Sequence, residues 1–296
     1  MKFQDRTQAG QLLARSLARY KGRDVVVYAL PRGGVLVAAE VAAYLKAPLE
    51  LIIARKIGHP MSPEYAIGAV TETGHPVWNE SELGFTEPGW RLSKIALARQ
   101  EAKRRRIKYQ GDRGPADPQG KVAVIVDDGI ATGLTMVAAV KDVLKQRPKA
   151  VVVAVPVAAE SALDQLVPFI DELVALNVLS GYFGSVGEYF DNFPQVDDEE
   201  VRVCIEAYRT VADNTLDLSA LNSVLATVKQ YPATSGDLAA RAKRLHSPAS
   251  VVNFFESIPN DVEFTDQADV MRRSEIAELI MEEETVQPDE SLRSYD

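Results

Sequence analysis

The segment Lys121–Thr135, KVAVIVDDGIATGLT, decides the fold. Residues 122–126 are a continuous apolar run of mostly β-branched residues, which is typical of a parallel strand buried on both faces. Asp127 and Asp128 follow this strand, and a loop of small residues then leads into an apolar helix. Ligands of open α/β sheets bind beyond the carboxyl ends of the strands. The backbone N–H groups of the loop and the positive end of the helix dipole favour a phosphate, whereas the two acids favour hydroxyl groups or a cation.

This combination resembles the phosphoribosyl-diphosphate (PRPP) binding motif of type I phosphoribosyltransferases, which residues 124–135 match over its whole length. The resemblance implies that Asp127 and Asp128 hold the ribose 2′- and 3′-hydroxyls, close to Mg²⁺. It also implies a loop around the 5′-phosphate, formed by Gly129, Ala131, Thr132, Gly133, Leu134 and Thr135. The Walker and dinucleotide-binding glycine motifs are both missing from this segment. The alternative is a purely structural role, in which an aspartate caps the turn after a buried strand. That role explains one of the two acids but not both.

A second ligand-binding loop is predicted at Pro31–Gly34, after the apolar strand at residues 24–30. The two strands are expected to be parallel, so their carboxyl ends lie at the same edge of the sheet. Gly33 and Gly34 let the backbone approach a ligand, and the forked guanidinium of Arg32 suits phosphate oxygens. Alone, this segment fits a tight turn with a solvated arginine. In the resembling family the pyrophosphate loop has this position, often with a cis non-proline peptide, and together with the first motif we favour that interpretation.

Residues 55–74 are polar, with Gly and Pro around a predicted strand at residues 66–71. Arg55 and Lys56 end the preceding strand on the ligand side of the sheet. The resemblance implies that this region leads into a flexible loop that closes over the active site, from which Arg55, Lys56 and His59 reach the diphosphate. For His59, an exposed loop histidine without a role is an equal alternative.

A basic helix is predicted over residues 87–109. Such a run suits RNA binding, a cation for the diphosphate, or a solvated face that pairs with acids of a partner subunit. We favour the solvated or interface interpretation, in a homodimer.

Further strands at residues 49–54, 150–156 and 172–176, with helices between them, predict a three-layer α/β domain with four or five parallel strands. A Gly- and aromatic-rich segment follows the last strand. We interpret it as a hood over an acceptor base, with Tyr182 or Phe183 stacking on that base. The alternative is that these aromatic side chains only seal an edge of the core.

The order of the motifs resembles one group of stand-alone bacterial phosphoribosyltransferases of unassigned substrate. We therefore expect a phosphoribosyltransferase domain at residues 1–211, a small all-helical domain of unknown function at residues 212–281, and a disordered acidic tail at residues 282–296. The helical part resembles a small bacterial domain and contains no residues that suggest chemistry.

The composition supports a cytoplasmic protein. The one cysteine, Cys204, suits a reducing compartment, and no window has the length of a membrane span. Residues 1–10 are too polar for a signal peptide. The net charge of −9 disfavours nonspecific binding of nucleic acids.

The resemblance implies an Mg²⁺-dependent enzyme that moves ribose 5-phosphate from PRPP to a nitrogenous acceptor, as in nucleotide salvage, and releases pyrophosphate. Asp127, Asp128, Arg32 and Lys56 are the expected catalytic residues. In this family an Asp at the position of Ala131 serves 6-oxopurines, so Ala131 disfavours hypoxanthine, guanine and xanthine as acceptors. The alternative is a non-catalytic regulator that senses PRPP or nucleotides.

Overall fold

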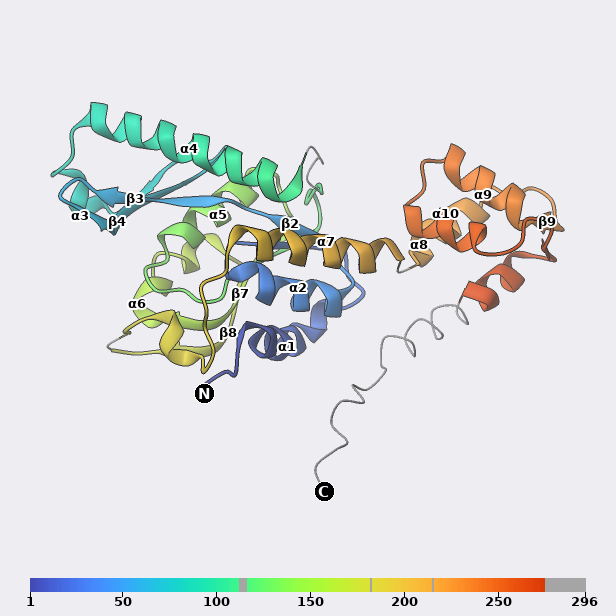
Figure 1. The fold of residues 1–296 in the computed structure, drawn as a ribbon, viewed down its shortest axis with the longest axis horizontal. Helices are drawn as coiled ribbons and strands as arrows, with labels where there is room; N and C mark the ends of the chain where they lie inside the picture. The colour runs from blue at the N-terminus through green and yellow to red at the C-terminus, as the bar shows by residue number, and fades with distance from the viewer. Residues whose placement is uncertain (112–115, 182, 215, 275–296) are drawn as a thin grey trace, which may run out of the picture. The chain divides into compact units, whose positions relative to one another are not determined.

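Five parallel strands form the central sheet of the protein (Figure 1). The structure is a computed structural model and describes residues 1–111, 116–181, 183–214 and 216–274. In spatial order the strands are β2 (Leu49–Leu51), β1 (Val25–Ala29), β6 (Val122–Val126), β7 (Ala150–Ala159) and β8 (Glu172–Leu179). The central strand β6 pairs in register with both neighbours, so that Val124 lies opposite Val27 and Val152. All residues of β1 and β6 are buried, which explains their continuous apolar sequences.

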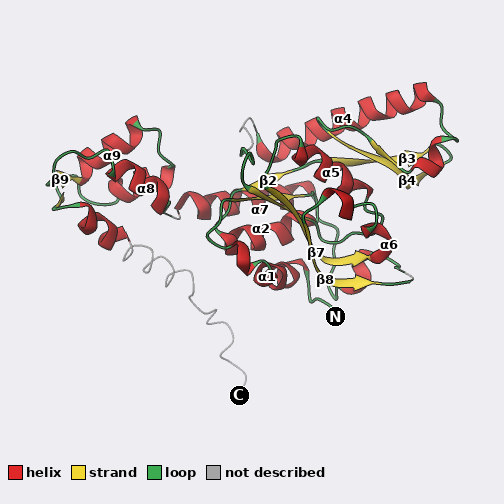
Figure 2. Cartoon of the chain, turned by 180° about the vertical axis from the view of Figure 1, so that it is seen from behind, coloured by secondary structure: helices red, strands yellow, loops and turns green. Residues whose placement is uncertain are grey.

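Helices cover both faces of the sheet and complete the three layers (Figure 2). On one face, α1 (Arg6–Ser16), α2 (Gly34–Leu45) and α7 (Asp198–Asn214) pack against alternate residues of β1 and β6. On the other face, α5 (Leu134–Leu144) and α6 (Glu160–Leu163) pack against the residues between them. The predicted three-layer α/β fold is therefore confirmed.

The segment after β2 differs in part from the prediction. The strand predicted at residues 66–71 is confirmed as the second half of β4 (Ser62–Thr71). The residues around it also form strands, β3 (Ala54–His59) and β5 (Val77–Trp78), which pair with β4 in a three-stranded antiparallel sheet. The pairing of β3 with β4 shifts register on either side of Gly58, where a Cβ atom would overlap the carbonyl oxygen of Pro63. The strand β3 and the first half of β4 are mostly polar and at least half-exposed, so with this irregularity they lack the alternation by which strands are usually recognised.

The basic helix is confirmed as α4 (Pro88–Gln110). Several of its cations pair with acids of the same chain rather than projecting freely into solvent: Arg104 and Arg105 with Glu101, Arg106 with Glu72, and Lys108 with Asp198. The helix between β7 and β8 is short, because α6 ends at Leu163 and the 3₁₀ turn η2 (Val167–Phe169) that follows contains Pro168.

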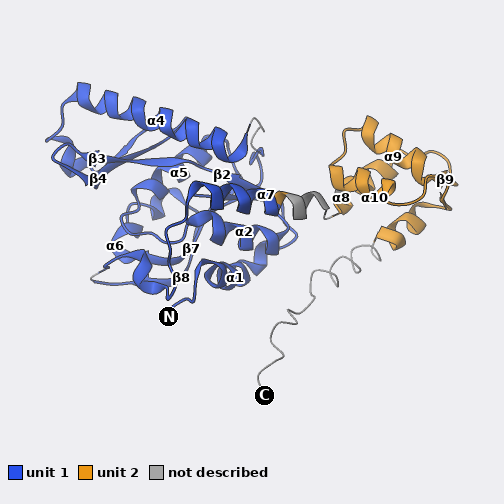
Figure 3. Cartoon of the chain, viewed as in Figure 1, with its two compact units in different colours: residues 1–208 blue, residues 209–296 orange. Residues whose placement is uncertain are grey.

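The chain divides into two compact units, residues 1–208 and residues 209–296 (Figure 3). In the second unit, α8 (Leu218–Leu225), α9 (Ser235–Arg244) and α10 (Ala249–Glu256) enclose an apolar core. The unit is not entirely helical, since β9 (Ala233–Thr234) pairs with β10 (Glu263–Phe264).

The predicted acidic tail, residues 282–296, lies outside the described residues, and the predicted domain limits stay predictions. Across the ranges that the structure describes, no helix combines the length and the apolarity needed to cross a membrane.

Candidate active site

A cavity of about 420 Å³ opens where β1 and β6 end, and most of the predicted site residues line it. Its lining comes from four segments of the first unit: the loop after β1, the start of β3, the loop after β6, and the segment around Val186. The predicted residues that line it are Arg32, Gly33, Arg55, Lys56, Asp127, Asp128, Gly129, Ala131, Thr132, Gly133 and Thr135.

The two acids at the end of β6 have different environments. The Asp127 carboxylate accepts a 2.8 Å hydrogen bond from the backbone N–H of Asp128. Burial, together with the neighbouring charge of Asp128, raises the pKa of Asp127 well above its usual range. Asp128 instead has a cationic partner, because its Oδ2 accepts a 2.8 Å hydrogen bond from Nε of Arg6.

Arg6 is the main residue that the sequence analysis missed. It begins α1, its guanidinium lies 3.6 Å from the centre of the Phe193 ring, and its Nη1 donates a 2.8 Å hydrogen bond to the carbonyl of Pro194. In the sequence it is only a polar residue at the start of an amphipathic helix, so no local pattern distinguishes it from the other arginines.

The Pro31–Gly34 loop packs directly against the two acids. The Pro31–Arg32 peptide is cis, as the family resemblance implied. A Cβ atom at Gly33 would overlap Asp128 Oδ2, and one at Gly34 would lie 2.8 Å from the Cα of Asp127. Both positions therefore require glycine because the loop lies so close to β6. Gly34 is buried as the first residue of α2 and does not line the cavity.

The loop after β6 turns into α5 at Gly133, whose φ of 77° is in the left-handed region that favours glycine. Ala131 and Thr132 are exposed at the cavity, and Thr135 in the first turn of α5 also lines it. Leu134 points elsewhere, since its side chain is part of the core beneath α5. The loop thus presents small side chains and a helix N-terminus, which together favour an anion.

The start of β3 brings two cations, Arg55 and Lys56, to the cavity. Arg55 is half-buried, and burial together with the nearby Arg105 lowers the pKa of its guanidinium. Within the described ranges, neither Arg55 nor Lys56 has a hydrogen-bonded or ion-paired side-chain partner.

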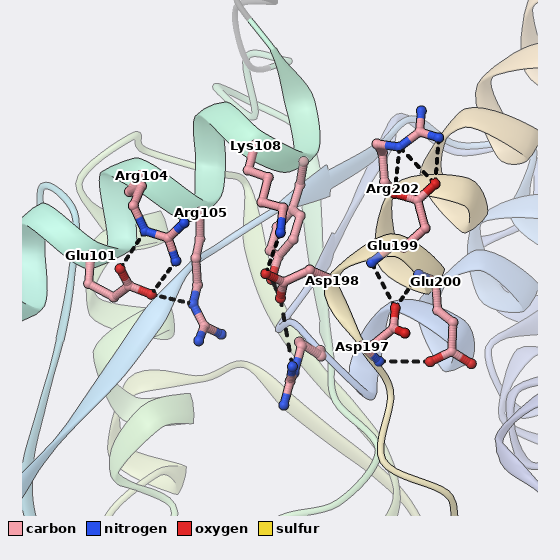
Figure 4. Close-up of polar contacts among 11 residues, drawn as sticks. Glu101, Arg104, Arg105, Lys108, Asp197, Asp198, Glu199, Glu200 and Arg202 are labelled. Atoms are coloured by element: carbon pink, nitrogen blue, oxygen red, sulfur yellow. Dashed lines mark hydrogen bonds and ion pairs between the residues drawn. The ribbon is translucent and has the colours of Figure 1, made fainter.

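Arg32 has an acidic neighbour at the start of α7, shown in Figure 4. Its Nη1 lies 3.7 Å from Oδ1 of Asp198. Oδ1 also accepts a 2.6 Å hydrogen bond from the hydroxyl of Tyr109, and Oδ2 accepts one of 2.7 Å from Nζ of Lys108. These two hydrogen bonds lower the pKa of Asp198 to about 2, so Asp198 is ionised and ties α4 to α7 beside the loop of Arg32.

Besides Gly34 and Leu134, two predicted ligand residues do not line the cavity, His59 and Phe183. His59 lies at the far end of β3, where its Nδ1 accepts a hydrogen bond from the backbone N–H of Met61. Phe183 stacks on Tyr189 at 5.6 Å and packs at the edge of the core, as the alternative interpretation proposed. Tyr182 lies outside the described residues. Val186 lines the cavity instead, against Gly129, and no sequence signal identified it.

The two acids could bind a magnesium ion only if oxygen atoms of a ligand or of water complete its coordination. No cluster of three or more His, Cys, Asp or Glu side chains suited to a metal occurs among the described residues. Mg²⁺ takes six oxygen ligands and is commonly bound by one or two carboxylates, substrate phosphates and water. Asp127 and the free oxygen of Asp128 are sufficient for that mode of binding, provided that the ligand is a diphosphate.

Taken together, the fold and the cavity define an α/β protein with a cavity at the carboxyl ends of parallel strands, lined by residues that suit an anionic ligand. Residues 5–166 match the family model for the phosphoribosyl transferase domain, which is more than half of the chain. The chain therefore belongs to the phosphoribosyl transferase family.

Known proteins with a similar sequence or structure agree with this membership. The Mycobacterium tuberculosis protein named "Putative phosphoribosyl transferase Rv0571c" (strain H37Rv) is 39% identical over 214 residues, which are 71% of this chain and 48% of that protein. Its counterpart from strain CDC 1551, MT0597, matches equally. The crystal structure of TT1426 from Thermus thermophilus is 40% identical, with a TM-score of 0.60 over 70% of this chain and 99% of that one. The chain spans about half the length of the mycobacterial relatives.

Proposed function

We propose that this protein transfers ribose 5-phosphate from PRPP to a nitrogenous acceptor, a nucleobase, with release of pyrophosphate. The observation that supports this proposal is the convergence of three groups on one cavity. These are the two acids after β6, the small-residue loop that opens α5, and the cations Arg32, Arg55 and Lys56. PRPP has a monophosphate, two free ring hydroxyls and a diphosphate, and each group of residues suits one of these.

In this proposal the reaction needs no covalent nucleophile. The bond from C1 of the ribose to the diphosphate breaks early, and positive charge develops on the ribose ring. Asp127 and Asp128 hold the ribose hydroxyls and favour that charge, and Arg32 and Lys56 stabilise the negative charge on the departing diphosphate. Mg²⁺, when bound with the diphosphate, further neutralises the leaving group.

The experiment is calorimetry of the full chain with PRPP and Mg²⁺, followed by an assay of pyrophosphate release with a panel of nucleobases. Binding of PRPP and turnover with at least one base support the proposal, and the absence of PRPP binding would refute it. Ala131 predicts that 6-oxopurines are poor acceptors. PRPP binding without turnover on any base would favour the alternative, a sensor of PRPP or nucleotides. Sedimentation analysis of the same sample tests the proposed homodimer.

A further inference from the structure

The contacts of Arg6 set it apart from the other arginines of the first unit. Its side chain is 7% exposed and that of its partner Asp128 is 17% exposed, so the ion pair is almost fully removed from water. A charge in such a place is retained only when its hydrogen bonds are well made. The carboxylate of Asp128, the carbonyl of Pro194 and the face of the Phe193 ring meet this need.

Backbone pairing fixes the start of α1 beside this carboxylate. Phe3 and Gln4 exchange hydrogen bonds with residues 189–192, and the side chain of Asp5 caps α1 by accepting the N–H of Gln8. Arg6 is the next residue after this cap. Its guanidinium thus reaches Asp128 from a rigid helix end rather than from a free surface position.

The ion pair also lies against the Pro31–Gly34 loop. A Cβ atom on Gly33 would overlap Asp128 Oδ2 and would lie 2.8 Å from Nε of Arg6. Arg6 therefore contacts the acid at the end of β6, adjoins the loop after β1, and contacts the Phe193–Pro194 segment outside the cavity.

Asp128 lines the cavity, whereas Arg6 does not. Arg6 occupies Oδ2 of this carboxylate without entering the cavity, and it leaves Oδ1 to accept a hydrogen bond from a ligand. A carboxylate that is held by one oxygen has little freedom to rotate. Partners of this kind orient the groups that touch a ligand, and their loss typically costs about 10- to 100-fold in affinity or activity.

We propose that Arg6 is a positioning residue that fixes Asp128 with a single oxygen toward the ribose hydroxyls and ties this carboxylate to the Phe193–Pro194 segment. This inference rests on the proposed binding of PRPP. It assigns to α1, which lies outside both ligand loops, control over recognition of the sugar.

The test compares two ligands that differ in the sugar: PRPP and inorganic pyrophosphate, each titrated with Mg²⁺ into the full chain by calorimetry. Arg6→Met should weaken PRPP binding about 10- to 100-fold and pyrophosphate binding by a much smaller factor, since pyrophosphate has no hydroxyls for Asp128 and meets it only through Mg²⁺. Arg6→Lys, which keeps the charge but loses the fork, should recover only part of the PRPP affinity. Arg15→Met, at an exposed arginine of the same helix, is the matched control and should bind both ligands as the unaltered chain does.

A double-mutant cycle with Asp128→Asn separates positioning from a general structural role. Once the carboxylate is removed, Arg6→Met should add little to the loss of PRPP affinity. Unchanged PRPP affinity in Arg6→Met would overturn the inference, and so would equal losses for PRPP and pyrophosphate. If Arg6→Met does not fold, the affinities of Arg6→Lys for PRPP and for pyrophosphate are compared in the same way, and a loss confined to PRPP supports the inference. Failure of the unaltered chain to bind PRPP would instead refute the proposed function itself.

Discussion

The two sides of the cavity differ in how their charges are compensated. On the side formed by β6, the chain supplies partners of its own: Asp128 pairs with Arg6, and Asp127 accepts the N–H of Asp128. On the side formed by β3, neither Arg55 nor Lys56 has such a partner anywhere in the described ranges. The acids are thus held by hydrogen bonds before a ligand binds, whereas the side chains of the two cations are left to pair directly with an anionic ligand. This difference suits a ligand that presents hydroxyls to one side and phosphates to the other.

The largest effect is expected on the side of the acids. Asp128→Asn keeps the shape of the side chain but removes its charge, and it should lower pyrophosphate release by about 10²- to 10³-fold or more. The rate is measured with PRPP and an accepted base, and circular dichroism confirms that the variant is folded. Asp24→Asn, at an exposed acid before β1, is the control and should have normal activity. Full activity of Asp128→Asn would contradict its assigned role.

The second effect concerns the cations. Arg55→Met keeps an apolar stem but loses the guanidinium, and it should weaken binding of Mg²⁺-pyrophosphate by about 10- to 100-fold, as for a lost hydrogen bond to a charged group. Its melting temperature should not fall, because burial beside Arg105 disfavours the charge of Arg55 in the unliganded chain.

Lys103→Met, at an exposed cation of α4, is the control and should bind pyrophosphate normally. A fall in the melting temperature of Arg55→Met without a loss of affinity would show that the charge of Arg55 serves the fold and not the ligand.

The β6 side could be predicted from the sequence and the β3 side only in part, for a physical reason. A strand buried on both faces must be apolar throughout, and acids directly after it must lie where the strand ends. The local sequence of residues 122–128 is therefore sufficient to predict both the strand and the position of the two acids. The strand β3 and the first half of β4 are mostly exposed or half-exposed, and their pairing is irregular at Gly58, so this part of the sequence resembles a loop. Only the largely buried second half of β4, residues 66–71, could be predicted as a strand. The pair of Arg6 and Asp128 joins residues 122 positions apart, and only the folded chain reveals it.

A third, smaller effect distinguishes the two acids by stability. The folded chain raises the pKa of Asp127, so its ionisation opposes folding at any pH above the usual pKa of an aspartate. Asp127→Asn should therefore raise the melting temperature at pH 7 to 8, with a smaller gain near pH 4, while PRPP binding is lost. Asp128→Asn should lower it, because Arg6 then keeps a buried charge without its counter-charge. Thermal melts of both variants between pH 4 and pH 8 test the contrast, and shifts of the same sign would contradict it.

The smallest effect is expected at Asp198, which joins the loop of Arg32 to α4 and α7. Hydrogen bonds from Lys108 and Tyr109 lower its pKa to about 2, so its contribution to stability is complete above the unfolded pKa and is lost as the pH falls toward the folded one. Because the pair is partly solvated, Asp198→Asn should cost about 1 kcal/mol of unfolding free energy at pH 7. Urea denaturation at pH 7, 4 and 3 should show the difference from the unaltered chain shrinking with each step. A difference that does not change with pH would mean that packing at the start of α7, rather than the charge of Asp198, stabilises this side of the cavity.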